Sequence, residues 1–206
     1  QNYPLSFGTA HVFYPEAGEA HCTACLLIDV DPVELVRGKR QAGGGLLDQY
    51  VNDRPYAASS FLSVAIGQVF STALAGRCHG RPELVTQPLP LTVQLPVTPA
   101  RGDDDLVPAL FEPLGYTVEM ERVPLDERFP DWGDSPYVAL TLSATITVKE
   151  LLSHLYVLLP VLDNAKHYWV GQDELEKLLR HGADWLAGHP EKGRIARRYL
   201  RHQWSL

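Results

Sequence analysis

An alternating run in the second half of the chain constrains the fold more than any other feature. Within residues 137–148, YVALTLSATITV, apolar side chains occupy every second position: Val138, Leu140, Leu142, Ala144 and Ile146. This period places them on one face of a β-strand. The most apolar run of the chain follows directly, LLSHLYVLLPVLD (151–163), and it is too short to span a bilayer. The pattern predicts a buried helix packed on a sheet.

The remaining elements are read from the same periodicities and from turn residues. Strands are predicted over 5–14, 21–30, 89–97 and 116–125, and the prolines of 89–97 suit an edge strand. Helices are predicted around 31–38, 61–76, 105–115, 149–163, 172–187 and 191–203, with Leu178 on an apolar stripe of the 172–187 helix. The expected class is α+β: a largely antiparallel sheet with a core helix, followed by a helical C-terminal segment. One domain over 1–206 is expected, with a subdomain change near 149 as the alternative.

Charge and cysteine content limit the classes of function. A formal net charge of −7 argues against a protein that coats nucleic acid by itself, although a local basic patch remains open. Three cysteines and no secretory signal favour a reducing, cytoplasmic setting, and no membrane partner is expected. Because the chain does not begin with Met, we expect a fragment or a processed product.

No catalytic constellation is evident, and no catalytic or metal residue is predicted. Cys22 and Cys25 form a CxxC, but an offset of three within a strand sends them to opposite faces. The glycines 43–45 lack the residues of a phosphate-binding loop, and Asp103–Asp105 are explained as acidic residues at a helix start. A catalytic triad formed by residues that are distant in the sequence remains an alternative, but no sequence feature supports it.

Two segments carry candidate partner-binding residues. In DNAKHYWVGQDE (163–174), we expect Trp169 and Val170 to point inward, while the partner-facing residues are Lys166, His167 and Tyr168; a purely structural loop is the alternative. In residues 46–61, Tyr and Arg side chains of the kind favoured at interfaces alternate with acids. The candidates there are Asp48, Tyr50, Asp53, Arg54 and Tyr56. The alternative is an Arg–Asp pair that closes a turn.

A basic face is predicted near the C-terminus. Arg194, Arg197, Arg198 and Arg201 follow helical i, i+3, i+4, i+7 spacing. This face would contact an acidic partner or RNA phosphates, or would simply be solvated.

Several long strings resemble one protein family. They are SFGTAHVFYPEA, CTACLLIDVDPVELVRG, LLDQYVNDRPYAASSFLSVAI, LFEPLGY, PLDERFPDWGDSPY, LLSHLYVLLPVLDNAKHYWVGQDELEKLL and IARRYLRHQ. From about residue 5 to its end, the chain resembles the N-terminal half of the bacterial Hen-type 3′-terminal RNA ribose 2′-O-methyltransferase. The family usually begins some tens of residues earlier.

The resemblance implies a role in RNA repair. This half of the family binds the ligase domain of the bacterial polynucleotide kinase–phosphatase–ligase and activates adenylylation of its lysine. S-adenosylmethionine and a divalent metal belong to the C-terminal methyltransferase domain of the full protein, so no cofactor is expected in this chain. If the chain is a ligase activator, we expect it to contact RNA only indirectly or weakly. The alternative is an RNA-binding module that positions broken 3′ ends for methylation.

Overall fold

The computed structural model describes residues 1–31, 60–126, 128–164 and 172–200. The strands are β1 (Asn2–Leu5), β2 (Gly8–Ala17), β3 (Cys22–Val30), β4 (Leu89–Pro99), β5 (Thr117–Pro124) and β6 (Asp134–Ile146). The α-helices are α2 (Ser60–Val69), α3 (Ser71–Leu74), α4 (Leu106–Phe111), α5 (Val148–Asp163), α6 (Gln172–Gly182) and α7 (Lys192–Leu200). Short 3-10 turns are η3 (Pro82–Leu84), η4 (Glu112–Leu114), η5 (Pro130–Trp132) and η6 (Leu186–Gly188). The α+β class is confirmed. The chain divides into two compact units, Gln1–Ala57 and Ala58–Leu206.

The sheet of the second unit is antiparallel, in the order β4-β6-β5. Strand β6 lies in the centre, which agrees with its alternating sequence: Val138, Leu140 and Leu142 are buried, whereas the side chains between them are half-exposed. Leu142 faces Val93 of β4, and Leu140 faces Met120 of β5. The proline-containing strand β4 forms an edge, as its sequence predicts.

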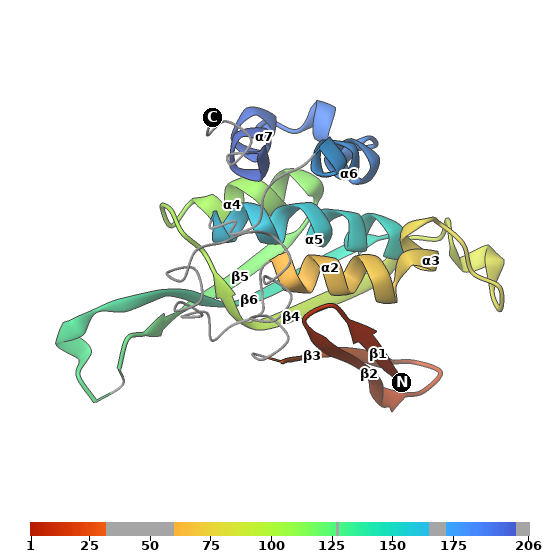
Figure 1. Cartoon of the computed structure of the whole chain (residues 1–206), viewed down its shortest axis with the longest axis horizontal. Coiled ribbons are helices and arrows are strands. Elements are labelled where there is room, and N and C mark those ends of the chain that lie inside the picture. The colour runs from red at the N-terminus through yellow and green to blue at the C-terminus, as the bar shows by residue number, and fades with distance from the viewer. Residues whose placement is uncertain (32–59, 127, 165–171, 201–206) are drawn as a thin grey trace, which may run out of the picture. The chain divides into compact units, whose positions relative to one another are not determined.

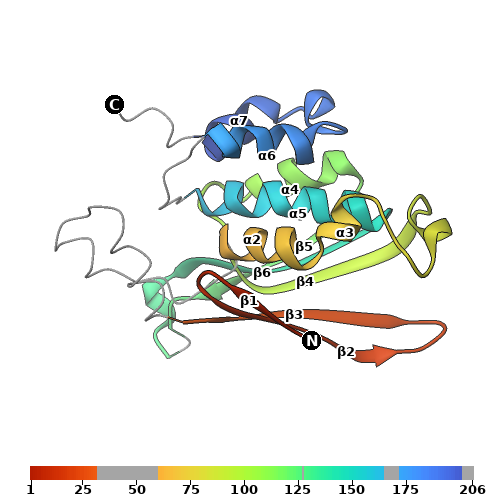
Figure 2. The ribbon, with the colours of Figure 1, turned by 45° about the vertical axis from the view of Figure 1, so that its right-hand side comes forward.

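Helix α5 forms the middle of this unit. It contacts β4 and α2 on one side and α6 and α7 on the other, so that the helices lie in two layers above the sheet (Figure 1, Figure 2). Every residue from Leu152 to Asp163 is buried, which explains why the sequence is apolar around the whole helix. A capping box starts it: the Thr147 side chain accepts a hydrogen bond from the Glu150 amide, and the Glu150 carboxylate accepts one from the Thr147 amide. Asn164, with φ 46°, ends the helix in the left-handed conformation.

The first unit contains an antiparallel sheet in the order β1-β2-β3. The prediction of one continuous strand over 5–14 is wrong, because the chain turns at Ser6 and Phe7 and pairs Leu5 with Gly8. At Gly8, φ is 146° and an added Cβ would lie 2.0 Å from the Asp29 carbonyl oxygen, so only glycine fits. Strand β2 extends to Ala17, and the chain turns at residues 18–21, where the Gly18 amide donates to the His21 carbonyl oxygen at 2.8 Å; the register shift between Phe13 and Glu16 accommodates a proline.

One helix prediction also needs correction. The helix predicted over 172–187 ends at Gly182, and the Trp185 ring N–H then donates to the His181 carbonyl oxygen at 2.9 Å. The apolar stripe predicted for this helix also includes Leu175 and Leu179; Leu178 is buried, but Leu175 and Leu179 are exposed. The segment predicted as a helix around 31–38 lies outside the described residues, apart from Asp31. The end predicted at Gly76 is confirmed by its positive φ of 63°.

Candidate protein-interaction surfaces

Most of the partner-binding candidates lie outside the described part of the chain. Residues 46–56, with Asp48, Tyr50, Asp53, Arg54 and Tyr56, fall in the range 32–59. Residues 166–168, with Lys166, His167 and Tyr168, fall in 165–171, and Arg201 falls in 201–206. Their roles therefore stay predictions.

The structure places three of the four arginines of the predicted basic face on α7, in three different environments. Arg198 is half-buried: its guanidinium donates to the Val161 carbonyl oxygen at 3.0 Å and to the Arg101 carbonyl oxygen. Arg194 lies 3.7 Å from an Asp103 carboxylate oxygen and 3.8 Å from one of Glu191. Arg197 is exposed, and its Nε donates to the Gly193 carbonyl oxygen at 3.3 Å. Arg194 and Arg198 thus contact groups outside α7, whereas the contact of Arg197 is to a carbonyl of α7 itself.

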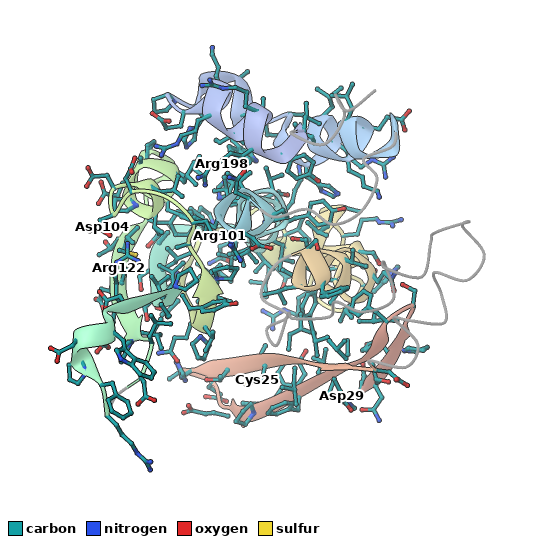
Figure 3. All side chains as sticks on the ribbon, turned by 60° about the vertical axis from the view of Figure 1, so that its left-hand side comes forward. Cys25, Asp29, Arg101, Asp104, Arg122 and Arg198 are labelled. Atoms are coloured by element: carbon teal, nitrogen blue, oxygen red, sulfur yellow. The ribbon has the colours of Figure 1, made fainter. Side chains whose placement is uncertain are left out.

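The contacts of Arg198 have a structural purpose. The last carbonyl groups of a helix have no partner within the helix, and a guanidinium with several donors can satisfy them. Arg198 reaches the Val161 carbonyl in the last turn of α5 and the Arg101 carbonyl in the segment after β4. Figure 3 shows Arg101 and Arg198 beside each other. Arg101 itself pairs with the buried Asp163 at 3.5 Å. Arg198 therefore connects three parts of the second unit: helix α7, the end of α5 and the segment after β4.

Two of the three consecutive aspartates, Asp103 and Asp104, are paired with arginines in the folded unit. Asp104 accepts a hydrogen bond from Arg122 Nε of β5 at 3.0 Å, and the two lie together in Figure 3. Asp103 pairs with Arg194, as described above, and Asp105 precedes α4 without a side-chain cap hydrogen bond. Among the residues that the structure describes, no group of three or more His, Cys, Asp or Glu side chains is arranged to hold a metal ion.

A polar and aromatic cluster lies inside the second unit. The Tyr116 hydroxyl and His154 Nδ1 are 2.9 Å apart, and the His154 ring meets Trp185 edge-on at 5.1 Å between centroids. His189 Nε2 donates to the Leu110 carbonyl oxygen at 3.0 Å. Burial lowers the pKa of His154 to about 4 and raises the pKa of Tyr116. Both groups are neutral near pH 7 and are used in packing α5 against its neighbours.

The end of the β5–β6 hairpin presents the most exposed aromatic group of the second unit's described residues. This hairpin end comprises residues 125–126 and 128–134. Phe129 and Trp132 stack with centroids 4.7 Å apart and planes inclined by 14°. They remain 50% and 61% exposed, and Leu125 is 56% exposed. In Figure 1 the hairpin extends well beyond the helices that cover its sheet. Large apolar side chains gathered in solvent are a common mark of an interaction surface.

Backbone hydrogen bonds hold the hairpin end in shape. The Leu125 amide donates to the Gly133 carbonyl at 3.0 Å, and the Phe129 amide donates to the Asp126 carbonyl at 3.1 Å. The Trp132 amide donates to the Phe129 carbonyl at 3.0 Å. Gly133 has φ 78° and ψ −162°, a conformation that other residues rarely adopt. The aromatic pair is therefore positioned by the backbone of the hairpin end itself.

Sequence reasoning did not select this surface. The segment PLDERFPDWGDSPY entered only as part of a family resemblance. The available signal was a short stretch of turn-forming residues that carries bulky apolar side chains without the period of a helix or a strand.

Comparison with known families identifies the chain's relatives. A family model described as the RNA repair, ligase-Pnkp-associating region of Hen1 matches residues 1–206. The chain belongs to this family. The resemblance read from the sequence strings is therefore confirmed. A search among curated proteins finds no match.

Family membership makes this an RNA-repair-associated domain. The family description names an association with the ligase Pnkp, which is compatible with a non-catalytic domain. In the ranges that the structure covers, no helix has both the length and the apolar character needed to cross a membrane.

Proposed function

We propose that this chain binds the ligase domain of the bacterial polynucleotide kinase–phosphatase–ligase and activates adenylylation of the ligase lysine. The observation that carries the proposal is the match of the ligase-Pnkp-associating family model to the whole chain, residues 1–206. The chain acts as a cytoplasmic, non-catalytic activator within an RNA-repair assembly.

The physical requirement for activation is a preference for one conformation of the partner. A bound protein shifts a conformational equilibrium only by the difference in its affinity for the two states. To raise an active population from about 1% to about 50% takes roughly 2.7 kcal/mol of preference. A few well-buried aromatic or arginine contacts supply that much. An activator of this kind needs no nucleophile, metal or cofactor of its own.

The chemistry of RNA methylation belongs to a different part of the full protein in this proposal. S-adenosylmethionine and a divalent metal would be held by a C-terminal methyltransferase domain that modifies the terminal ribose. The present chain would bring that activity to the ligase. RNA would reach the assembly mainly through the partner and the methyltransferase, because the chain is acidic and two described arginines of its basic face contact groups within the fold.

Ligase adenylylation in the presence and absence of the chain tests the proposal. The ligase domain is incubated with ATP labelled in the adenylyl group, alone and with the 206-residue chain. The expected result is covalent label on the ligase only when both proteins are present. A ligase with its reactive lysine replaced by alanine is the matched control and should take up no label.

Two outcomes would count against the proposal in different ways. If the two proteins elute as one complex but the ligase takes up no label, the chain is a binding module and the activation is wrong. If they neither bind nor react, the ligase-activating role inferred from the family does not apply to this chain. Direct, strongly salt-dependent RNA binding would then favour the RNA-positioning alternative.

A further inference from the structure

The hairpin end leaves its largest apolar side chains in solvent although its backbone is held by several hydrogen bonds. Phe129, Trp132 and Leu125 are all at least half exposed. A large apolar area is thus left in solvent, although the chain has a hydrophobic core in which such side chains are usually buried. The polar groups around them are used locally: Ser135 Oγ donates to the Val123 carbonyl at 2.6 Å, and the Arg128 amide donates to Asp126 Oδ1 at 2.8 Å. The segment is thus shaped for contact with another surface.

Preorganisation makes the aromatic pair a suitable anchor. Binding is weakened by the entropy lost when side chains and loops become ordered, and a loop that is ordered beforehand avoids much of that loss. Phe129 and Trp132 already restrict each other by stacking, at 4.7 Å between ring centroids. The turn η5 and Gly133 fix the backbone beneath them. Tryptophan is also among the residues that most often dominate interface energetics.

Charge around the pair indicates the kind of surface that would receive it. The described residues of the hairpin end carry three carboxylates, Asp126, Asp131 and Asp134, against one guanidinium, Arg128. An apolar centre with an acidic rim is complementary to an apolar depression surrounded by basic side chains. An RNA ligase must bind ATP and RNA phosphates, so basic surface is expected on it. The same carboxylates disfavour RNA itself as the occupant.

We propose that Phe129 and Trp132 form the anchor through which the chain docks into an apolar depression on a basic face of the ligase domain. This inference rests on the proposed function, since it takes the ligase as the partner. The aromatic pair supplies the buried contact, and the carboxylates of the hairpin end orient the approach and set its dependence on salt. The positions of the two rings relative to each other are part of the site.

Affinity measurements with single variants of the full chain test the anchor. Trp132→Ala and Phe129→Ala are compared with Tyr14→Ala, which removes an equally exposed aromatic ring (60%) from the other unit. Loss of an interface anchor costs about 2 kcal/mol, so Trp132→Ala should weaken ligase binding roughly 30-fold. Tyr14→Ala should leave the affinity within about 2-fold of wild type. Thermal melts check that all variants fold as wild type does.

A charge reversal provides a second, independent variant. Asp131→Lys should slow association with the ligase and reduce its dependence on salt, because rim charges act mainly on the association rate. Glu112→Lys makes the same change at an exposed position in η4, outside the hairpin end, and should alter the rate less.

The results separate the inference from the proposed function. If wild-type chain does not bind the ligase, the proposed function fails and the anchor fails with it. If wild type binds and Trp132→Ala binds equally well, only the anchor is refuted. Equal losses for Trp132→Ala and Tyr14→Ala also refute it. The anchor is also refuted if Trp132→Ala loses binding to single-stranded RNA while its binding to the ligase is unchanged.

Discussion

Protonation of His154 is expected to destabilise the second unit as the pH falls below about 6.5. The ring is buried in α5, with Nδ1 2.9 Å from the Tyr116 hydroxyl and Trp185 against its side. Burial removes the water that would solvate an imidazolium and lowers the pKa of His154 from 6.5 to about 4. The charge of Glu150 opposes this shift, and that of His189 adds to it.

The sign and size of the effect follow from the two pKa values. In the unfolded chain the imidazole takes up a proton near pH 6.5, whereas in the folded unit it does so only near pH 4. The unfolded state therefore binds more protons between these values, and the stabilising contribution, complete above pH 6.5, is lost as the pH falls toward 4. At about 1.4 kcal/mol per pKa unit, the loss amounts to roughly 3 kcal/mol.

Urea unfolding of wild type and His154→Asn at a series of pH values measures this contribution. The asparagine amide oxygen can accept from Tyr116 in the place of Nδ1 but does not titrate. The unfolding free energy of wild type minus that of His154→Asn should fall by about 3 kcal/mol between about pH 7.5 and pH 4. Carboxylates and other histidines titrate in both proteins and cancel. A gap that stays constant over this range would show that His154 is not held neutral by burial.

Two further predictions concern an arginine and a glycine. Arg198→Met should lower the free energy of unfolding by about 1–3 kcal/mol, because carbonyl groups in α5 and after β4 lose their donor. The control variant Arg197→Met should change the free energy of unfolding by less than about 0.5 kcal/mol. Urea unfolding of both variants measures the difference. Gly133→Ala forces a side chain into φ 78° at a cost of roughly 1–3 kcal/mol. It should also weaken ligase binding with both rings present, as calorimetric titration would show.

Periodicity was sufficient to predict the centre of the second unit. The alternation in β6 and the apolar run of α5 each correspond to a single environment, one face of a sheet and a fully buried helix. Such patterns are informative because burial recurs at regular positions along the whole element. The edge position of β4 followed similarly, from its prolines.

Features that depend on distant partners were not predictable. The turn at Ser6 and Phe7 has neither residue of a favoured two-residue hairpin, and Gly8 matters because the Asp29 backbone passes close to it. Arg198 lies in a helix, as predicted, but the carbonyl groups that it contacts come from elements far away in the sequence. The same limit applied to Phe129 and Trp132, since exposed and buried aromatic rings look alike in a sequence.

The hairpin end bears on how such a domain can change during evolution. Its aromatic side chains lie beyond Pro124 and Asp134, the last pair between β5 and β6, and its described backbone hydrogen bonds are largely closed within the segment itself. Substitutions on its outer surface therefore alter recognition with little effect on the core, provided that Gly133 is kept. Partner choice can drift, or follow changes in a coevolving ligase, while selection for folding acts on a separate set of residues.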